Sequence, residues 1–319
     1  MPDLTSLLTG SSVRVRVPAS SANIGPGFDS IGLALGIWDE CVATVTKEPG
    51  LRIDVAGEGA HEVARDELNL IHRSMAAAWA ELHVQVPAGL HLSCHNAVPH
   101  CRGLGSSATS IVAGVVAAQG LRDIATGLKQ PGDGFDHGFT NNLAAALEGH
   151  PDNSSASVFG GMTLSWTDDA VPGQIHTVPL EVSPQVLPLV FVPEAKLSTA
   201  SARAVLPSQV SHRLAASNSG RAALLVQAVT ARPDVLLAAT REWLHQEQRR
   251  PAFPDSMALL DLLRGRGHAA VISGAGPSVL VLSTPAQLQD AQAQADPAVW
   301  RVLQPGIPTT GASLARLRA

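Results

Sequence analysis

The stretch from Pro99 to Ala118, PHCRGLGSSATSIVAGVVAA, most constrains what this chain can fold into. A turn that contains Gly103 and Gly105 leads directly into small apolar residues with helical character. Glycine reaches backbone angles that are closed to residues with a Cβ, and the hydroxyls of Ser106 and Ser107 suit a helix N-cap. The free N–H groups and the dipole of a helix that begins there favour an anion such as phosphate.

Two interpretations of this stretch stay open from its residues alone: a capped helix start and an anion site. Ser106, and not a lysine, directly follows Gly105, which excludes a Walker-type phosphate loop. Gly103, Gly105 and Ala108 satisfy the loose dinucleotide pattern G-x-G-x-x-A. Asp123 follows the glycines at about the sequence separation of the acid that contacts the ribose in this pattern. Its surroundings, QGLRDIATG, are however not the tip of an apolar strand. We therefore interpret the dinucleotide match as accidental.

The composition limits the classes of protein that remain. With 319 residues, 45% of them hydrophobic, the chain can bury the cores of two domains. A net charge of -5 with dispersed lysines and arginines excludes a nucleic-acid surface. Three unevenly spaced cysteines, no signal-peptide pattern and no apolar run of about 18 residues predict a cytoplasmic protein without a membrane span.

Hydrophobic periodicity predicts alternating strands and helices. We expect strands at Val13–Val17, Val42–Thr46, Leu51–Val55, Leu90–Cys94, Met162–Trp166 and Leu189–Val192, and a strand, turn, strand unit in AAVISGAGPSVLVL. We expect helices at Asn69–Leu82 with Asn69 as N-cap, Ser106–Gln119 ended by Gly120, Asn141–Glu148, Gly220–Thr230, Asp234–His245 and Asp255–Arg264, and a loop at Leu128–Gly138. The polar segment TDDAVPG separates residues 1–167 from residues 168–319, which we expect to form two domains.

Three further polar segments are candidates for chemistry. EGHPDN, from Glu148 to Asn153, offers two acids, one suited to Mg2+ and the other to a substrate proton, although taken alone a capped helix end with an Asp-Asn turn is the better explanation. The loop from Asn23 to Asp29 suits a polar substrate or a plain Asx-turn. SGAGPS, from Ser273 to Ser278, suits a backbone ligand contact or a β-turn. The spacing of Cys94-His95 and His100-Cys101 argues against a zinc site.

The order of these segments resembles one protein family. PASSANIGPGFDSIGLAL, GLGSSATS and SGAGPSVLVL are similar to the three motifs of the GHMP kinases, and the resemblance covers nearly the whole chain from Val13 onward. The first motif, with EGHPDN and TASARAVLP, is similar in particular to the members that phosphorylate homoserine. This resemblance implies an α+β fold with a ribosomal-S5-like ATP-binding domain, residues 1–167, and a ferredoxin-like domain, residues 168–319. The active site would lie between them.

The same resemblance implies ATP and Mg2+ as cofactors. The glycine turn would hold the phosphates, with a site formed by Pro99, Arg102, Gly103, Leu104, Gly105, Ser106, Ser107 and Ala108. Asn69 in NLIHR resembles the segment that flanks the adenine. Ser107 and Glu148 would lie around Mg2+, which prefers hard oxygen ligands.

The substrate implied by the resemblance is L-homoserine, and the products are O-phospho-L-homoserine and ADP. Asn23 and Asp29 would hold the ammonium and hydroxyl region, Arg203 and Arg249 the carboxylate, and Gly276 would also contact the substrate. His150, Asp152 and Asn153 would lie beside the reacting hydroxyl, and whether Asp152 is a true base stays open. A homodimer is common among such kinases. The alternatives are a GHMP kinase of the mevalonate or shikimate type and a relative that binds ATP or a metabolite without catalysis.

Replacing Gly105 with a bulky residue tests the proposed phosphate site. We expect ATP binding to weaken before homoserine binding does, because the added side chain would fill the turn that receives the phosphates. Separate titrations of each ligand measure this. The reverse order of effects would show that the phosphate site is assigned to the wrong turn.

Overall fold

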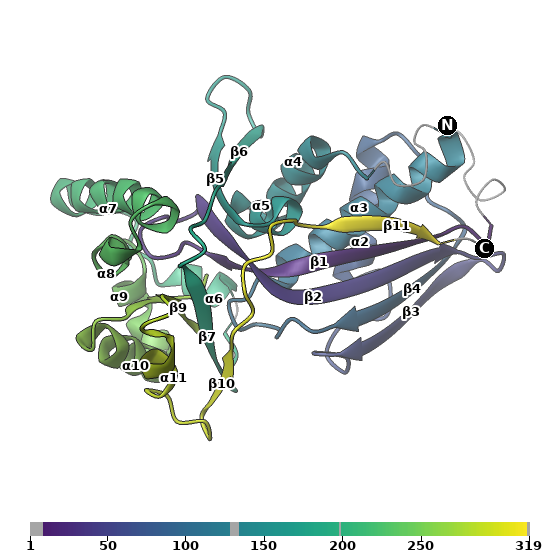
Figure 1. Cartoon of the computed structure of the whole chain (residues 1–319). Coiled ribbons are helices and arrows are strands. Elements are labelled where there is room, and N and C mark those ends of the chain that lie inside the picture. The colour runs from purple at the N-terminus through teal and green to yellow at the C-terminus, as the bar shows by residue number, and fades with distance from the viewer. Residues whose placement is uncertain (1–8, 128–133, 198, 318–319) are drawn as a thin grey trace.

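The computed structural model describes residues 9–127, 134–197 and 199–317, which form two sheets with their helices (Figure 1). The first sheet has the strand order β11-β1-β2-β4-β3, and β5 pairs with β2 and β6. Its strands are β1 (Ser12–Ala22), β2 (Ile31–Val45), β3 (Gly50–Gly57), β4 (Gly89–Asn96), β5 (Met162–Thr167), β6 (Ile175–Leu180) and β11 (Ser313–Leu317). The second sheet has the order β10-β7-β9-β8, with β7 (Leu187–Pro193), β8 (Ala269–Ile272), β9 (Val279–Ser283) and β10 (Trp300–Leu303).

The strand β1 shows how alternation in the sequence becomes a half-buried strand. Val13, Val15 and Val17 are fully buried, whereas Arg14 and Arg16 are exposed. The alternation ends at Val17, and both faces of the rest of β1 are buried. This second half of β1 delivers the chain to the loop that begins at Asn23.

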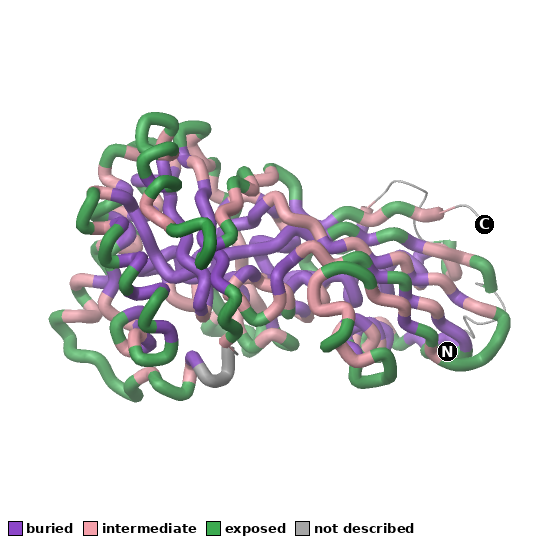
Figure 2. Tube along the Cα trace, turned by 90° about the horizontal axis from the view of Figure 1, so that it is seen from below, coloured by how far each residue is buried: buried purple, intermediate pink, exposed green. Residues whose placement is uncertain are grey.

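Four helices lie on one side of the first sheet (Figure 1). They are α2 (Leu70–Glu81), α3 (Ser106–Thr126), α4 (His137–Glu148) and α5 (Pro151–Phe159). Asn69 is the N-cap of α2 as expected, because its side chain accepts from the N–H groups of Ile71 and His72. The buried side chains of β1 pack with Trp79, Met75 and Val115 in one core, and Figure 2 shows buried positions in the interior with exposed positions around the outside.

The expected end of α3 at Gly120 is wrong. The helix continues to Thr126 and ends at Gly127, which has the left-handed conformation of a helix C-cap. A Cβ on Gly120 would lie 2.8 Å from Leu314 Cδ1. The small residue therefore serves the close packing of α3 against β11.

The topology of the first half goes beyond what its local patterns predict. The chain passes from β2 to β3 through Pro49, but these strands do not pair, because β4 lies between them and runs parallel to β3. A parallel pair needs a crossover, and α2 supplies it. The expected loop at 128–138 lies partly outside the described residues, since 128–133 are not described, and α4 already begins at His137.

The second sheet is flanked by the helices of the second half of the chain (Figure 1). They are α6 (Thr199–Ala204), α7 (His212–Thr230), α8 (Leu236–Ala239), α9 (Gln246–Arg249), α10 (Pro254–Gly265) and α11 (Leu288–Gln292), with 3-10 turns η1 (Pro233–Val235) and η2 (Arg250–Ala252). The expected helix from Asp234 to His245 is wrong, because only η1 and the four-residue α8 form there. The Glu242 carboxylate accepts the N–H groups of residues 244 to 246, which replaces helical hydrogen bonds with a local turn.

The C-terminal end of the chain returns to the first sheet. β11 pairs antiparallel with β1, from Ser12 opposite Leu317 to Arg16 opposite Ser313. β6 also belongs to this sheet through its pairing with β5. The domain division at residues 167 and 168 stays a prediction. Within the described part of the chain, no helix is both long and apolar enough to cross a membrane.

Two glycine-to-alanine changes in helices should have opposite effects on stability. A Cβ on Gly114 in α3 would lie 2.4 Å from the backbone oxygen of Ile71, so Gly114→Ala should lower the free energy of unfolding by about 1–3 kcal/mol. Gly220 in α7 has open space, so Gly220→Ala should raise it by about 0.5–1 kcal/mol. Urea unfolding of both variants measures this, and equal shifts would contradict the tight α2–α3 contact.

Candidate active site

A cleft gathers the polar segments that lie far apart in the sequence. It is lined by the loop between β1 and β2, the glycine turn before α3, the end of α4, the start of α5, α6, α9 and the β8–β9 turn. The lining side chains and backbone belong to Ala22, Asn23, Phe28, Asp29, Cys101, Gly103, Leu104, Gly105, Ser106, Ser107, Glu148, His150, Asp152, Asn153, Leu197, Arg203, Arg249, Gly274 and Ala275. Most of the residues expected in the site therefore lie around one space.

The glycine turn has the left-handed backbone that its sequence suggests. Gly103 has φ 72° and Gly105 φ 71°. A Cβ at these positions would lie 2.1 Å from Ser273 O and 2.1 Å from Ser20 Oγ, respectively, so both must be glycine. The expectation that the serines cap α3 is wrong, because Gly105 is the N-cap and no side chain caps the helix. Helix α3 therefore begins at the cleft, and no capping side chain accepts a hydrogen bond from its first N–H groups.

Glu148 and Ser107 form a hydrogen-bonded pair at this helix end. Ser107 Oγ donates to Glu148 Oε2 over 2.7 Å. Burial raises the pKa of Glu148, while the Ser107 hydroxyl and the charge of His150 partly offset this effect. A desolvated carboxylate beside a hydroxyl is a hard oxygen pair whose charge a cation would stabilise, so these two residues fit Mg2+.

His150 and Asp152 face one another across the start of α5. His150 is the N-cap position of the helix, and its Nδ1 lies 2.6 Å from Asp152 Oδ1. Burial by itself would lower the pKa of His150, but the hydrogen bond to Asp152 and the negative charges of Asp152 and Glu148 raise it overall. A Cβ on Gly32 in β2 would lie 1.8 Å from the Asp152 carbonyl oxygen. The acidic end of α5 is therefore seated directly on the sheet backbone.

A second grouping of possible metal ligands lies next to this pair. One ligand atom from each of Asp29, His150 and Asp152 lies within 4.8 Å of the others. Asp152 is buried and already hydrogen-bonded to the Asn153 N–H and to His150. The side chain of Asn153 accepts from Ser20 Oγ over 3.0 Å. These contacts fix the polar end of α5 against β1.

Asn23 uses both ends of its amide to hold the loop between β1 and β2. Its Nδ2 donates to Gly274 O over 3.0 Å, and its Oδ1 accepts from the Asp29 N–H over 3.0 Å. Asn23 and Asp29 have φ values of 69° and 56°, a conformation that asparagine and aspartate tolerate better than most residues. The side chain of Asn23 thus positions Asp29 and ties the loop to the β8–β9 turn.

Two arginines meet this loop from the second half of the chain. Arg203 in α6 pairs with Asp29, with Nη2 2.5 Å from Oδ1 and Nη1 3.2 Å from Oδ2. Arg249 is 2% exposed and donates from Nε to Ala202 O over 2.9 Å. The guanidinium carbon of each lies 5.7 Å from the ring centroid of Phe28. The cleft therefore places one carboxylate and two guanidinium groups around a single aromatic ring.

The structure does not bring every expected residue to the cleft. Arg102 donates to three backbone carbonyls, those of Pro193, His100 and Glu194, so its guanidinium ties the glycine turn to the end of β7. Pro99 and Arg102 line a separate groove, and Ala108 is buried in α3. Gly276 lies behind the cleft, where a Cβ would meet Phe253.

Asn69 lines a second pocket close to the start of α3. This pocket is lined by Val55, Val63, Ala64, Leu68, Asn69, Leu70, Ile71, Cys94, Asn96 and Ser110. Ser110 lies one helical turn after Ser106, which lines the cleft. One helix N-terminus thus borders both spaces.

Sequence reasoning missed Phe28 and Gly274 as lining residues of the cleft. Phe28 was present in the quoted loop, and its place between polar turn residues was the available signal. Gly274 belongs to the SGAGPS segment that the sequence singles out, but only the approach of the β8–β9 turn to Asn23 and Arg249 shows that Gly274, and not Gly276, lines the cleft.

The chain is similar to known kinases over almost its whole length. The family models described as the N terminal domain and the C terminal of GHMP kinases match residues 69–161 and 225–301. Homoserine kinase of Streptomyces avermitilis is 47% identical over 310 residues, which cover 97% of each chain. Homoserine kinase of Streptomyces coelicolor is 50% identical over 273 residues, 86% of this chain and 85% of that one. The crystal structure of homoserine kinase from Cytophaga hutchinsonii has a TM-score of 0.80 at 24% identity, covers 95% of this chain and 97% of that one, and shows the shared fold.

The titration of His150 tests the electrostatics of the cleft. Its raised pKa means that the stabilisation from this pair is full below pH 6.5, the ordinary value, and is lost as the pH rises through the folded-state pKa. NMR should therefore show a His150 titration midpoint above 6.5, and Asp152→Asn should lower that midpoint. Circular dichroism controls for the fold of the variant. A midpoint that does not change in Asp152→Asn would contradict the assigned cause.

Proposed function

Because this chain belongs to the GHMP kinase family, we propose that it transfers the γ-phosphoryl group of ATP to the side-chain hydroxyl of L-homoserine. The products are O-phospho-L-homoserine and ADP. The family and the α+β fold expected from the motifs are confirmed, and with them an ATP-dependent kinase activity. The observation that carries the proposal is the convergence of an uncapped helix N-terminus with Asp29, Arg203 and Arg249 around one cleft.

In this proposal the N-terminus of α3 receives the phosphates of ATP. The N–H groups that follow Gly105 and the helix dipole stabilise the negative charge, and no Walker lysine is needed. The adenine occupies the neighbouring pocket beside Asn69 and Ser110. That arrangement is supported by the single helix start that borders both spaces.

Ser107 and Glu148 are the residues we propose to hold Mg2+. Their oxygens lie 2.7 Å apart, and burial raises the pKa of Glu148, so a cation bound beside this carboxylate would stabilise its charged form. Bound Mg2+ supplies charge stabilisation to the phosphate oxygens. The protein's own contribution is to hold the hydroxyl and the carboxylate at the helix end where those oxygens arrive.

The zwitterionic part of homoserine fits the opposite side of the cleft. Asp29 suits the ammonium group, and the forked guanidinium groups of Arg203 and Arg249 suit the carboxylate. Arg203 and Asp29 pair with one another in the structure, so each would exchange its partner for the matching group of the substrate. The exchange would keep Asp29 and Arg203 each paired with a group of opposite charge.

The substrate hydroxyl would then lie against His150, Asp152 and Asn153. Its oxygen forms a bond to the γ-phosphorus, and the bond from that phosphorus to the β–γ bridging oxygen breaks, so the electron pair leaves with ADP. Asp152 orients the hydroxyl, and its proton passes to that carboxylate as the new bond forms. Positioning supplies most of the acceleration, because a loose transition state needs little covalent help.

We also propose that the enzyme is a cytoplasmic homodimer. The support is the family resemblance for the dimer and the cysteine usage for the compartment: the three cysteines are free, and Cys41 and Cys94 are buried thiols.

An assay with a panel of substrates tests the function. With ATP and Mg2+, kcat/KM for L-homoserine should exceed that for mevalonate or shikimate by roughly a thousandfold or more, because those hydroxy acids have a carboxylate for the arginines but no ammonium group for Asp29. Release of ADP measures turnover. Preference for mevalonate or shikimate would move the chain to another substrate class, and no turnover with any hydroxyl substrate would overturn the enzyme assignment.

A further inference from the structure

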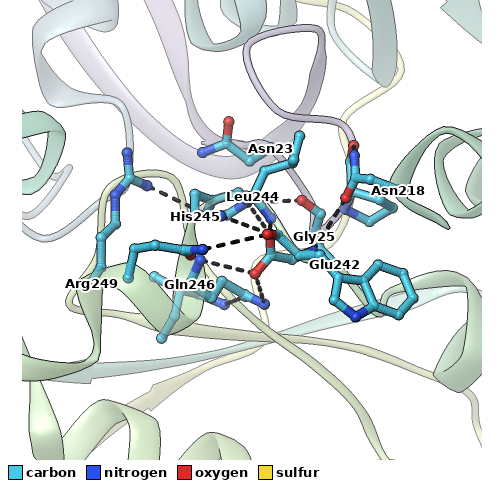
Figure 3. A network of polar contacts seen from close by, with 12 residues as sticks. Asn23, Gly25, Asn218, Glu242, Leu244, His245, Gln246 and Arg249 are labelled. Carbon is cyan, nitrogen blue, oxygen red and sulfur yellow. Dashed lines mark hydrogen bonds and ion pairs between the residues drawn. The ribbon is translucent and has the colours of Figure 1, made fainter. Parts of the chain in front are cut away.

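A buried polar network lies behind the substrate side of the cleft (Figure 3). The Glu242 carboxylate accepts the N–H groups of Leu244, His245 and Gln246 at 2.5, 2.9 and 2.9 Å. Gln246 Oε1 in turn accepts the Ile272 N–H over 2.6 Å, which connects the turn to β8. This network fixes the entry to α9, although the helix itself has only four residues.

The two ring nitrogens of His245 have partners that determine its protonation. Nε2 lies 2.9 Å from Gly25 O, and a carbonyl only accepts, so Nε2 carries the proton. Nδ1 lies 3.4 Å from Nη1 of Arg249, and a guanidinium only donates, so Nδ1 is the acceptor. Burial lowers the pKa of His245, which agrees with the neutral ring that these contacts require.

The same ring connects Arg249 with the substrate loop. His245 stacks on Phe28 with ring centroids 5.1 Å apart, and the cation of Arg249 also lies over Phe28. Gly25 and Phe28 belong to the loop that carries Asp29. One buried imidazole therefore contacts both the loop that holds one end of the proposed substrate and the arginine that holds the other end.

The donors of Arg249 are used unequally. Arg249 Nε donates to Ala202 O over 2.9 Å. Its Nη1 lies 3.4 Å from Gly274 O and 3.4 Å from His245 Nδ1. Within the described residues, Nη2 of Arg249 has no hydrogen-bond acceptor. A guanidinium that is anchored on one edge and open on the other is prepared to receive a carboxylate.

We propose that neutral His245 is a positioning residue that orients the guanidinium of Arg249 toward the carboxylate of the substrate. This inference rests on the proposed function, because it takes the amino-acid carboxylate to be the ligand of Arg249. His245 does not line the cleft, and its effect on the substrate acts through Arg249.

Two substitutions separate the two contacts of His245. The amide nitrogen of glutamine reaches the place of Nε2, so His245→Gln keeps the donor to Gly25 O and loses the acceptor for Arg249. The amide oxygen of asparagine reaches the place of Nδ1, so His245→Asn keeps the acceptor and loses the donor. His268→Gln is the matched control, because His268 is a buried histidine that pairs with Asp290 outside the cleft.

The kinetic test compares L-homoserine with 3-amino-1-propanol, which lacks only the carboxylate. In His245→Gln, KM for homoserine should rise about tenfold, while KM for ATP and kcat/KM for the aminoalcohol stay within about twofold of wild type. His245→Asn and His268→Gln should keep most of the preference for homoserine. Equal losses with both substrates, or a preference that is unchanged in His245→Gln, would overturn the positioning role.

A second measurement does not depend on the substrate assignment. Nitrogen-15 NMR of the unliganded protein should show His245 with a protonated Nε2 and an unprotonated Nδ1 at neutral pH. A protonated Nδ1 would overturn the inference whatever the enzyme phosphorylates. If wild type shows this tautomer but does not turn over homoserine, the proposed function fails, and with it the carboxylate role of Arg249.

Discussion

The close approach of three backbone segments is the contact on which the rest of this structure depends. The glycine turn lies between β1 and the β8–β9 turn, with Gly103 against Ser273 and Gly105 against Ser20. Ser273 Oγ donates to Gly103 O over 2.6 Å and lies 2.8 Å from Ser21 Oγ, and the Ser20 N–H donates to Leu104 O over 3.1 Å. No side chain larger than hydrogen fits at either glycine, so the two sheets meet here through backbone and small hydroxyls.

This junction explains why the cleft combines residues from both halves of the chain. Once the turns are in contact, α3 begins at the cleft, and the loop from Asn23 to Asp29 lies against the β8–β9 turn through the Asn23 side chain. The charged groups of the cleft then neutralise one another, as in the pairs of Arg203 with Asp29 and His150 with Asp152. The pair of Arg203 and Asp29 is only half-buried, which suits the exchange of partners that we propose for substrate binding.

Local sequence signals predicted those elements whose causes are local. Asn69 caps α2 because its own side chain reaches the first N–H groups, and Val13 to Val17 alternate because β1 has one exposed face there. The signals failed where distant residues decide. Gly120 stays inside α3 because Leu314 packs on it, and β3 does not pair with β2 because β4 has inserted between them.

The sequence by itself determined the family and the fold class, because the three motifs occur in order along the chain, and it pointed to most of the acids and arginines that line the cleft. Only the tertiary structure decided which of these groups meet. In the structure, Arg102 donates to backbone carbonyls, and Gly276 is not among the residues that line the cleft. The tertiary structure also placed His245, a residue without any motif signal, between Gly25 and Arg249. Such contacts depend on how separate elements pack in space, and a hydrogen bond between residues 220 positions apart, such as that of His245 with Gly25, leaves no local pattern in a sequence.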